Sequence, residues 1–177
     1  GLDPGFFRPA REVGLRQALG MEGFVAGYVG RLVEAKGVRT LLRAVSDLPS
    51  VQLLLVGGGP LQTEIDNWIV QHQLGGRIRR VDAVPHEAIA RHMNALDALV
   101  LPSQTTPTWK EQFGHVLIEA MACGVPVVGS SSGAIPEVVG DDAVQVRAGD
   151  AQALADGLER LLGDARLRDQ LGEQGLQ

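Results

Sequence analysis

Short apolar runs alternate with segments of helical periodicity along most of this 177-residue chain. The runs at 24–29, 51–56, 98–101 and 125–129 are apolar at nearly every position, which is typical of strands buried on both faces. Between them, apolar residues recur three and four positions apart, as on the buried face of a helix. This alternation predicts an α/β domain with a doubly wound parallel sheet, a Rossmann-like fold.

Weaker segments complete the predicted domain. Further strands are expected at 78–84 and 143–146. The predicted helices cover 38–48, 61–74, 85–94, 115–123, 136–139 and 151–162. Residues 1–22 contain several Gly and Pro residues without sustained periodicity, so we interpret them as a lead-in or linker and 23–177 as the domain.

Composition excludes several classes of protein. Hydrophobic residues make up 45% and charged residues 21%, as in globular domains. A net charge of -5 argues against a nucleic-acid partner, although a few local cations could still hold a small anion. No apolar run approaches the roughly 20 residues that cross a bilayer, and one Cys allows no internal disulfide. We therefore expect a cytoplasmic location.

In a doubly wound fold, ligands bind beyond the carboxyl ends of the strands. Arg31 follows the first predicted strand, and Lys36 lies at the start of the next helix. A guanidinium fork and an ammonium group suit phosphate oxygens, so this pair predicts an anion site. The alternative is a surface loop in which Glu34 forms an ion pair with one of the two cations.

Glu119 lies inside a predicted helix that is apolar on nearly every side. Burying a carboxylate is costly unless it is paired or hydrogen-bonded, and the hydroxyl pair of a ligand could supply the donors. Upstream, Gly114 would let an anion approach the N–H groups at the helix start. The alternative is a structural Glu119 that binds a buried Arg or a backbone amide.

Other motifs give weaker signals. Gly57-Gly58-Gly59 follows a strand, but Gln62 breaks the dinucleotide fingerprint. The scattered His residues and single Cys do not form a metal-binding pattern, so no metal site is predicted. The serines at 130–132 lack the spacing of a nucleophile elbow and are interpreted as a loop whose amides could meet a ligand.

The order of these motifs resembles the C-terminal, donor-binding domain of the retaining glycosyltransferases of family 4, which have the GT-B fold. The most specific element is the pair Glu111 and Glu119, separated by seven residues. The matching segments are Gly30-Arg31-Leu32 with Lys36-Gly37, Leu55 to Leu61, Val84-Pro85-His86, Leu101-Pro102-Ser103, Glu111 to Val128 and Gly133 to Val139. The segment 104–110 is longer than in many relatives, so the resemblance does not predict the shape of the sugar pocket.

The resemblance also implies roles for individual residues. Arg31 and Lys36 would grip the donor diphosphate, Glu111 would face the transferred sugar, and these three would form the catalytic set. Glu119 would bind the ribose hydroxyls of the nucleotide. Further donor contacts would come from Gly30, Gly57, Val84, Pro85, Phe113, Gly114, His115 and Val116.

The function implied is a metal-independent hexosyltransferase without a cofactor, using a nucleoside-diphosphate sugar as donor, with UDP- and GDP-sugars favoured. The acceptor would bind to an N-terminal domain preceding Gly1, and this chain alone would be inactive. The full-length enzyme would be cytoplasmic, with peripheral contact at the inner membrane face left open. Two alternatives also remain open: a non-catalytic nucleotide-sugar-binding module, and a sugar phosphorylase or epimerase on a GT-B-like scaffold.

Overall fold

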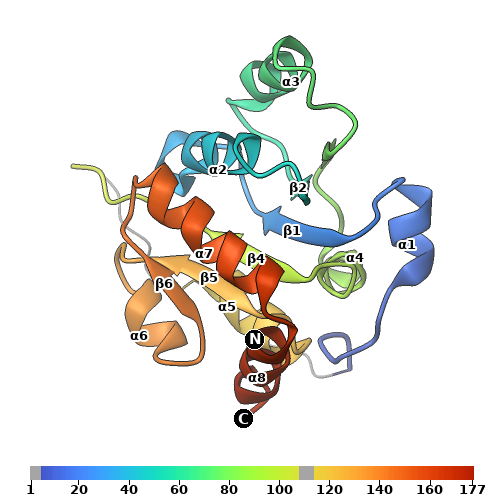
Figure 1. Ribbon diagram of the computed structural model, residues 1–177, viewed down its shortest axis with the longest axis vertical. Helices are drawn as coiled ribbons and strands as arrows, with labels where there is room; N and C mark the ends of the chain where they lie inside the picture. Colours follow the sequence, from blue (N-terminus) through green and yellow to red (C-terminus); the bar gives the residue numbers. More distant parts are fainter. Residues whose placement is uncertain (1–4, 108–113) are drawn as a thin grey trace.

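The computed structural model describes residues 5–107 and 114–177 (Figure 1). Its centre is a six-stranded sheet in the order β3-β2-β1-β4-β5-β6, with every neighbouring pair parallel. The strands are β1 (Phe24–Val29), β2 (Val51–Val56), β3 (Ile78–Val81), β4 (Ala98–Leu101), β5 (Val127–Ser130) and β6 (Val144–Val146). The predicted doubly wound α/β fold is confirmed.

Helices cover both faces of this sheet. They are α1 (Val13–Ala18), the 3-10 helix η1 (Glu34–Lys36), α2 (Val38–Ser46), α3 (Gln62–Gln71), α4 (His86–Met93), α5 (His115–Ala122), α6 (Ile135–Val139), α7 (Ala151–Gly163) and α8 (Ala165–Gly175). In Figure 1, α2 and α7 pack together in front of the sheet, whereas α5, which contacts both α4 and α6, lies behind it. In the described ranges, none of these helices combines the length and apolar character needed to cross a bilayer.

The strands are buried on both faces of the sheet, and one predicted strand ends earlier than expected. Leu53, Leu55 and Leu99 are fully buried, as expected for strands with helices on both faces. The prediction of a strand over 78–84 is wrong at its end, because β3 stops at Val81. The carbonyl of Val81 accepts from the N–H of Gly57 at 3.0 Å, and the chain then leaves the sheet edge.

The lead-in contains a helix that its sequence did not indicate. Arg16 of α1 is buried and lies 3.1 Å from Asp97, which in turn accepts a hydrogen bond from the backbone of Val25 at 2.8 Å. The Glu12 side chain caps the helix by accepting from the N–H of Leu15 at 3.3 Å. Contacts with the start of β1 and β4 therefore hold α1 against the domain.

Helix α8 was also not predicted from the sequence. This helix contains glycines, which normally argue against a helix, and it packs against the domain through one of them. A Cβ atom at Gly172 would lie 2.5 Å from the carbonyl oxygen of Gly124, so only glycine allows this approach. Gly124 has a φ of +68, and a Cβ there would lie 3.6 Å from both Pro9 and Leu176. The segments around Pro9 and Leu176 thus meet at the turn between α5 and β5.

Candidate functional site

The loops after β1 and β2 run side by side at the carboxyl edge of the sheet. The N–H of Gly30 donates to Val56 O at 3.0 Å, and the N–H of Leu32 donates to Gly58 O at 3.0 Å. A Cβ at Gly57 would lie 1.9 Å from the carbonyl oxygen of Gly30, so this approach requires glycine at 57. The close backbones leave open space beyond the strand ends.

A first cavity of about 350 Å³ lies over these two loops; we call it the apolar cavity. Gly30, Gly57 and Gly58 contribute backbone, and Arg31 lies at its margin. Its apolar wall comes from Val29, Val56, Ala83, Val84 and Ile89. An apolar wall with a few polar groups at its edge is typical of pockets that bind small molecules.

A second cavity of about 700 Å³ adjoins the first; we call it the cationic cavity. Gly30 and Arg31 line both cavities, so the two lie side by side. The other lining residues of the cationic cavity are Val33, Glu34, Ala35, Lys36 and Thr106. The buried Tyr28 fixes the backbone at this junction, because its hydroxyl donates to the carbonyl of Arg31. Arg31 and Lys36 therefore face the same space.

Glu34 does not neutralise Arg31. Its carboxylate lies 3.6 Å from Arg39, which also binds Glu64 at 2.7 Å. The hydrogen bond from Arg39 lowers the pKa of the Glu64 carboxyl. Within the described ranges, no carboxylate lies within ion-pair distance of Arg31, so the surface-pair alternative does not hold for this residue.

Backbone packing positions Lys36. The next residue, Gly37, has a φ of +74, and a Cβ there would lie 1.9 Å from the carbonyl oxygen of Pro102. The chain after β4 also donates from the N–H of Gln104 to Ala35 O at 2.8 Å. The segment after β4 and η1 are therefore packed together, which holds Lys36 at the cavity.

Helix α5 begins at the same edge and carries Glu119. Gly114 precedes it in the left-handed conformation, with a φ of +66. Burial raises the pKa of the half-buried Glu119 carboxyl, and the nearby His86 and His115 oppose this shift. None of the residues described here donates a hydrogen bond to the carboxylate, so the alternative of a structural Glu119 held by a buried Arg or amide is not found.

The predicted residues divide into three groups. Gly30, Arg31, Lys36, Gly57 and Val84 line the two adjoining cavities. Pro85 caps α4 next to Val84, while Gly114, His115, Val116 and Glu119 belong to the start and body of α5. Glu111 and Phe113 lie outside the described residues.

Sequence reasoning assigned no donor contact to the remaining lining side chains, which are Val29, Val56, Ala83 and Ile89 of the apolar cavity and Val33, Glu34, Ala35 and Thr106 of the cationic cavity. Ile89 looked like an ordinary helix residue. Thr106 lies in a segment whose pattern was uninformative.

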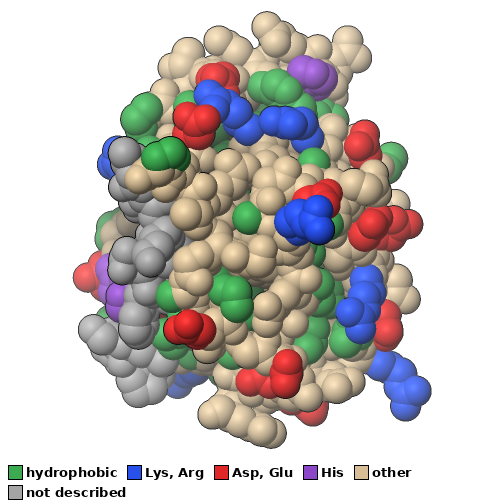
Figure 2. All heavy atoms as spheres, turned by 90° about the vertical axis from the view of Figure 1, so that its left-hand side faces the viewer, with side chains coloured by type: hydrophobic (Ala, Val, Ile, Leu, Met, Phe, Trp, Pro, Cys, Tyr) green, Lys and Arg blue, Asp and Glu red, His purple; other side chains and the backbone are tan. Residues whose placement is uncertain are grey.

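Figure 2 shows the edge toward which the arrowhead of β1 points in Figure 1. Charged side chains are scattered over this face around a broad area of backbone and uncharged polar atoms.

Across residues 5–107 and 114–177, no three His, Cys, Asp or Glu side chains are grouped to hold a metal ion.

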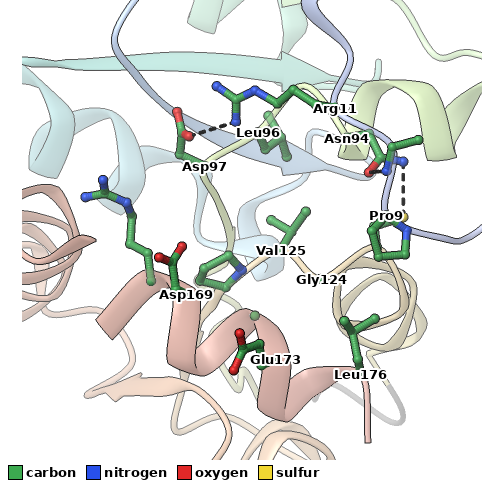
Figure 3. A pocket seen from close by; sticks show the side chains of 15 residues that line it. Pro9, Arg11, Asn94, Leu96, Asp97, Gly124, Val125, Asp169, Glu173 and Leu176 are labelled. Carbon is green, nitrogen blue, oxygen red and sulfur yellow. Dashed lines mark hydrogen bonds and ion pairs between the residues drawn. The ribbon is translucent and has the colours of Figure 1, made fainter. Parts of the chain in front are cut away.

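A separate cavity of about 350 Å³ lies at the opposite edge, before β4 and β5 (Figure 3). Arg11 and Asp97 form an ion pair at 3.2 Å on one side of it, and Asp169 and Glu173 of α8 lie on the other. None of the predicted donor residues lines it. The candidate site is therefore the pair of cavities at the carboxyl edge.

With this geometry in place, the comparisons with known proteins define the family. Residues 16–177 match the family described as glycosyl transferases group 1, and the chain belongs to this family, whose domain here is of the GT-B type. It is 32% identical over 195 aligned residues to a D-inositol 3-phosphate glycosyltransferase of Stackebrandtia nassauensis, covering 99% of this chain and 42% of that protein.

Solved structures agree with this assignment. The C-terminal domain of a glycosyl transferase group 1 family protein (LpcC) from Francisella tularensis has a TM-score of 0.86 and 26% identity, covering 99% of this chain and 95% of that one. Anabaena Alr3699/HepE in complex with UDP and glucose has a TM-score of 0.88 and 28% identity, covering 99% of this chain and 49% of that one. The chain thus spans less than half the length of the D-inositol 3-phosphate glycosyltransferase and of the Anabaena protein.

Proposed function

We propose that this chain is the donor-binding domain of a retaining, metal-independent glycosyltransferase of family 4. It binds a nucleoside-diphosphate hexose, with UDP-hexose as the first candidate. The acceptor binds to an N-terminal domain across the carboxyl edge of the sheet. The structure of the Anabaena protein with UDP and glucose supports uridine as the base.

One observation carries the proposal: the apolar and cationic cavities share Gly30 and Arg31. A nucleotide sugar has a flat base at one end and a diphosphate near its middle. The base lies in the apolar cavity against Val84, and the diphosphate lies in the cationic cavity between Arg31 and Lys36. Glu119 accepts hydrogen bonds from the ribose hydroxyls, which provides partners that its half-buried carboxylate does not find among residues 5–107 and 114–177.

The chemical step breaks the bond between the anomeric carbon of the hexose and the diphosphate oxygen. The acceptor hydroxyl oxygen forms a new bond to that carbon from the same face, and its proton passes to the departing diphosphate oxygen. Negative charge grows on the departing diphosphate. Arg31 and Lys36 stabilise this charge, commonly by a few kcal/mol for each donor group. Glu111 is proposed to face the transferred hexose.

Calorimetric titration of this chain with UDP tests the donor site. Arg31→Ala and Lys36→Ala each remove a cation that faces the diphosphate, so each should raise the Kd for UDP by about 10- to 100-fold. GDP titrated in parallel shows which base the apolar cavity prefers.

The matched control is Arg43→Ala, which removes an exposed cation of α2 and should leave the affinity unchanged. Unchanged affinity in both the Arg31 and Lys36 variants would remove these residues from the site.

Turnover by a two-domain protein tests the reaction itself. With UDP-hexose and acceptor, release of UDP should continue in the presence of EDTA, because protein cations stabilise the leaving group. Activity that EDTA abolishes and magnesium restores would contradict metal independence. If the protein binds UDP tightly but does not release UDP from UDP-hexose with any acceptor tested, it is a binding module and not an enzyme.

A further inference from the structure

A third space at the carboxyl edge lies beyond β4, β5 and β6, and has a volume of about 380 Å³. We call it the hydroxyl cavity. Its lining residues are Gln104, Thr105, Ser131, Ser132, Ala148 and Gly149. The proposed donor cavities lie at the ends of β1 and β2 and the loop after β3, so the hydroxyl cavity occupies the other half of the same edge.

The hydroxyl cavity has donors and acceptors that the described residues do not fully use. Thr105 Oγ1 and Ser132 Oγ lie 2.8 Å apart, so one hydroxyl donates to the other and the accepting hydroxyl keeps a proton to donate. Ser132 is buried, with 2% of its surface exposed, which fixes this pair. Ser131 Oγ accepts from the N–H of Ala148 at 3.3 Å, and its own proton has no acceptor among the described residues.

An amide group lies beside these hydroxyls. Gln104 Nε2 donates to the hydroxyl of the buried Thr40 at 3.0 Å, which orients the amide. A Cβ at Gly149 would lie 3.6 Å from the same nitrogen, so the amide reaches the wall contributed by Gly149. The second N–H and the carbonyl oxygen of Gln104 can therefore bind a ligand.

The uncharged lining of the hydroxyl cavity suits a neutral ligand. The six residues named as its lining bring no charged side chain. At the adjoining start of α7, the Asp150 carboxylate accepts from the N–H of Ala153 at 2.9 Å. This fixed negative charge already occupies the helix terminus and repels an anion such as phosphate. A neutral ring that carries several hydroxyl groups can both donate to and accept from these partners.

We propose that the hydroxyl cavity binds a neutral sugar ring of the acceptor, an inference that rests on the proposed donor function. The segment 104–106 separates the two sites, because Thr106 lines the cationic cavity whereas Gln104 and Thr105 line the hydroxyl cavity. A ring in the hydroxyl cavity therefore lies next to the donor without occupying its place. The domain that holds the donor thereby also contributes to the choice of acceptor.

Amide chemical shifts of the 177-residue chain test the proposal, with methyl α-D-glucopyranoside as the probe. Its titration should shift the amides of Thr105, Ser131, Ser132 and Gly149. UDP should instead shift Gly30, Gly57 and Val84, which tests the donor site separately. Shifts from the glucoside without shifts from UDP would reject the donor site and leave the sugar site standing.

Saturating UDP-glucose distinguishes an acceptor ring from the donor hexose. If the hydroxyl cavity binds the acceptor, the glucoside shifts should persist with UDP-glucose present. Their loss would assign the cavity to the donor hexose and overturn the proposal. No shift at the four amides up to the solubility limit of the glucoside would also overturn it.

Two variants test the hydroxyl pair directly. Ser132→Ala and Thr105→Val each remove one hydroxyl and should weaken glucoside binding by about three- to tenfold. Ser50→Ala removes an exposed hydroxyl that does not line the hydroxyl cavity, and it should leave the affinity for the glucoside unchanged. An unchanged Kd for UDP in each variant would show that the fold and the donor site are intact. Unchanged glucoside affinity in both cavity variants would overturn the proposal.

Discussion

At the scale of single residues, Glu119 is a half-buried carboxylate whose environment differs from that of ordinary protein surface. Burial raises the pKa of its carboxyl, with His86 and His115 opposing the shift. A raised pKa means that the folded protein holds the proton more tightly than the unfolded chain does. The stabilising contribution of this proton is complete at low pH and is lost as the pH rises through the folded-state pKa. At neutral pH, the ionised carboxylate therefore lowers the stability of the unliganded domain.

Glu119→Gln separates stability from binding. At neutral pH the variant should melt at a higher temperature than the wild type, because the amide is not charged. The difference should shrink under acidic conditions, where the wild-type carboxyl is protonated. The same variant should bind UDP roughly tenfold more weakly, because a neutral amide is a poorer acceptor for ribose hydroxyls. Melting curves across pH and calorimetry would measure the two effects, and equal stability at all pH values would contradict the first.

At the scale of elements, Gly37 joins η1 to α2 and sets the position of Lys36. Its φ of +74 favours glycine, and the carbonyl oxygen of Pro102 occupies the place of a Cβ. The strand-end segment after β4 therefore fits against η1 only when residue 37 has no side chain. A local backbone requirement in this way determines where Lys36, a proposed diphosphate ligand, lies.

Gly37→Ala should lower the free energy of unfolding by about 2 kcal/mol or more, because it combines backbone strain with a steric clash. UDP binding should weaken as well, since Lys36 moves with the loop. Gly76→Ala is the control: a Cβ there meets nothing within 4 Å, so we expect a change within about 0.5 kcal/mol. Urea unfolding measures both variants, and equal effects would show that the contact with Pro102 does not matter.

Elements also show what sequence reasoning could and could not predict. The strands were predictable because double burial makes nearly every position apolar, as in β2. Helix α1 was not predictable, because a buried Arg16 and its distant partner Asp97 hold it in place. Helix α8 packs through Gly172, and a glycine in a helical segment normally argues against a helix.

For the site, Arg31 was indicated by its place after a strand and Lys36 by its place at the start of the next helix, together with their charges. The close approach of Gly57 to the carbonyl oxygen of Gly30, which brings the two strand-end loops together, is not encoded in sequence periodicity.

At the scale of the whole molecule, Cys123 lies where the lead-in, α4 and α5 pack together, so its thiol is a probe of that packing. The thiol is 4% exposed, and Asn94 Nδ2 donates to its sulfur at 3.6 Å. Burial raises the pKa of Cys123 from 9.0 to about 11. The thiol form therefore stabilises the fold at neutral pH, and this contribution is lost as the pH rises toward about 11.

Thiol labelling at neutral pH should consequently proceed only through opening of the domain, because the thiol is both buried and protonated. A ligand that binds the folded state suppresses opening, so UDP at 100 times its Kd should slow labelling about 100-fold. Time courses with an aromatic disulfide reagent, with and without UDP, provide the measurement. Fast labelling that UDP does not slow would show that the region around Cys123 opens independently of the donor site.

The contact of Pro9 and Leu176 at Gly124 has a mechanical consequence. These two stretches of chain are far apart in sequence, yet both rest on one residue that has no side chain. The packing of both stretches therefore depends on the same turn. A side chain at residue 124 would meet the lead-in and the end of α8 at once, so a single substitution there should disturb both ends of the domain together.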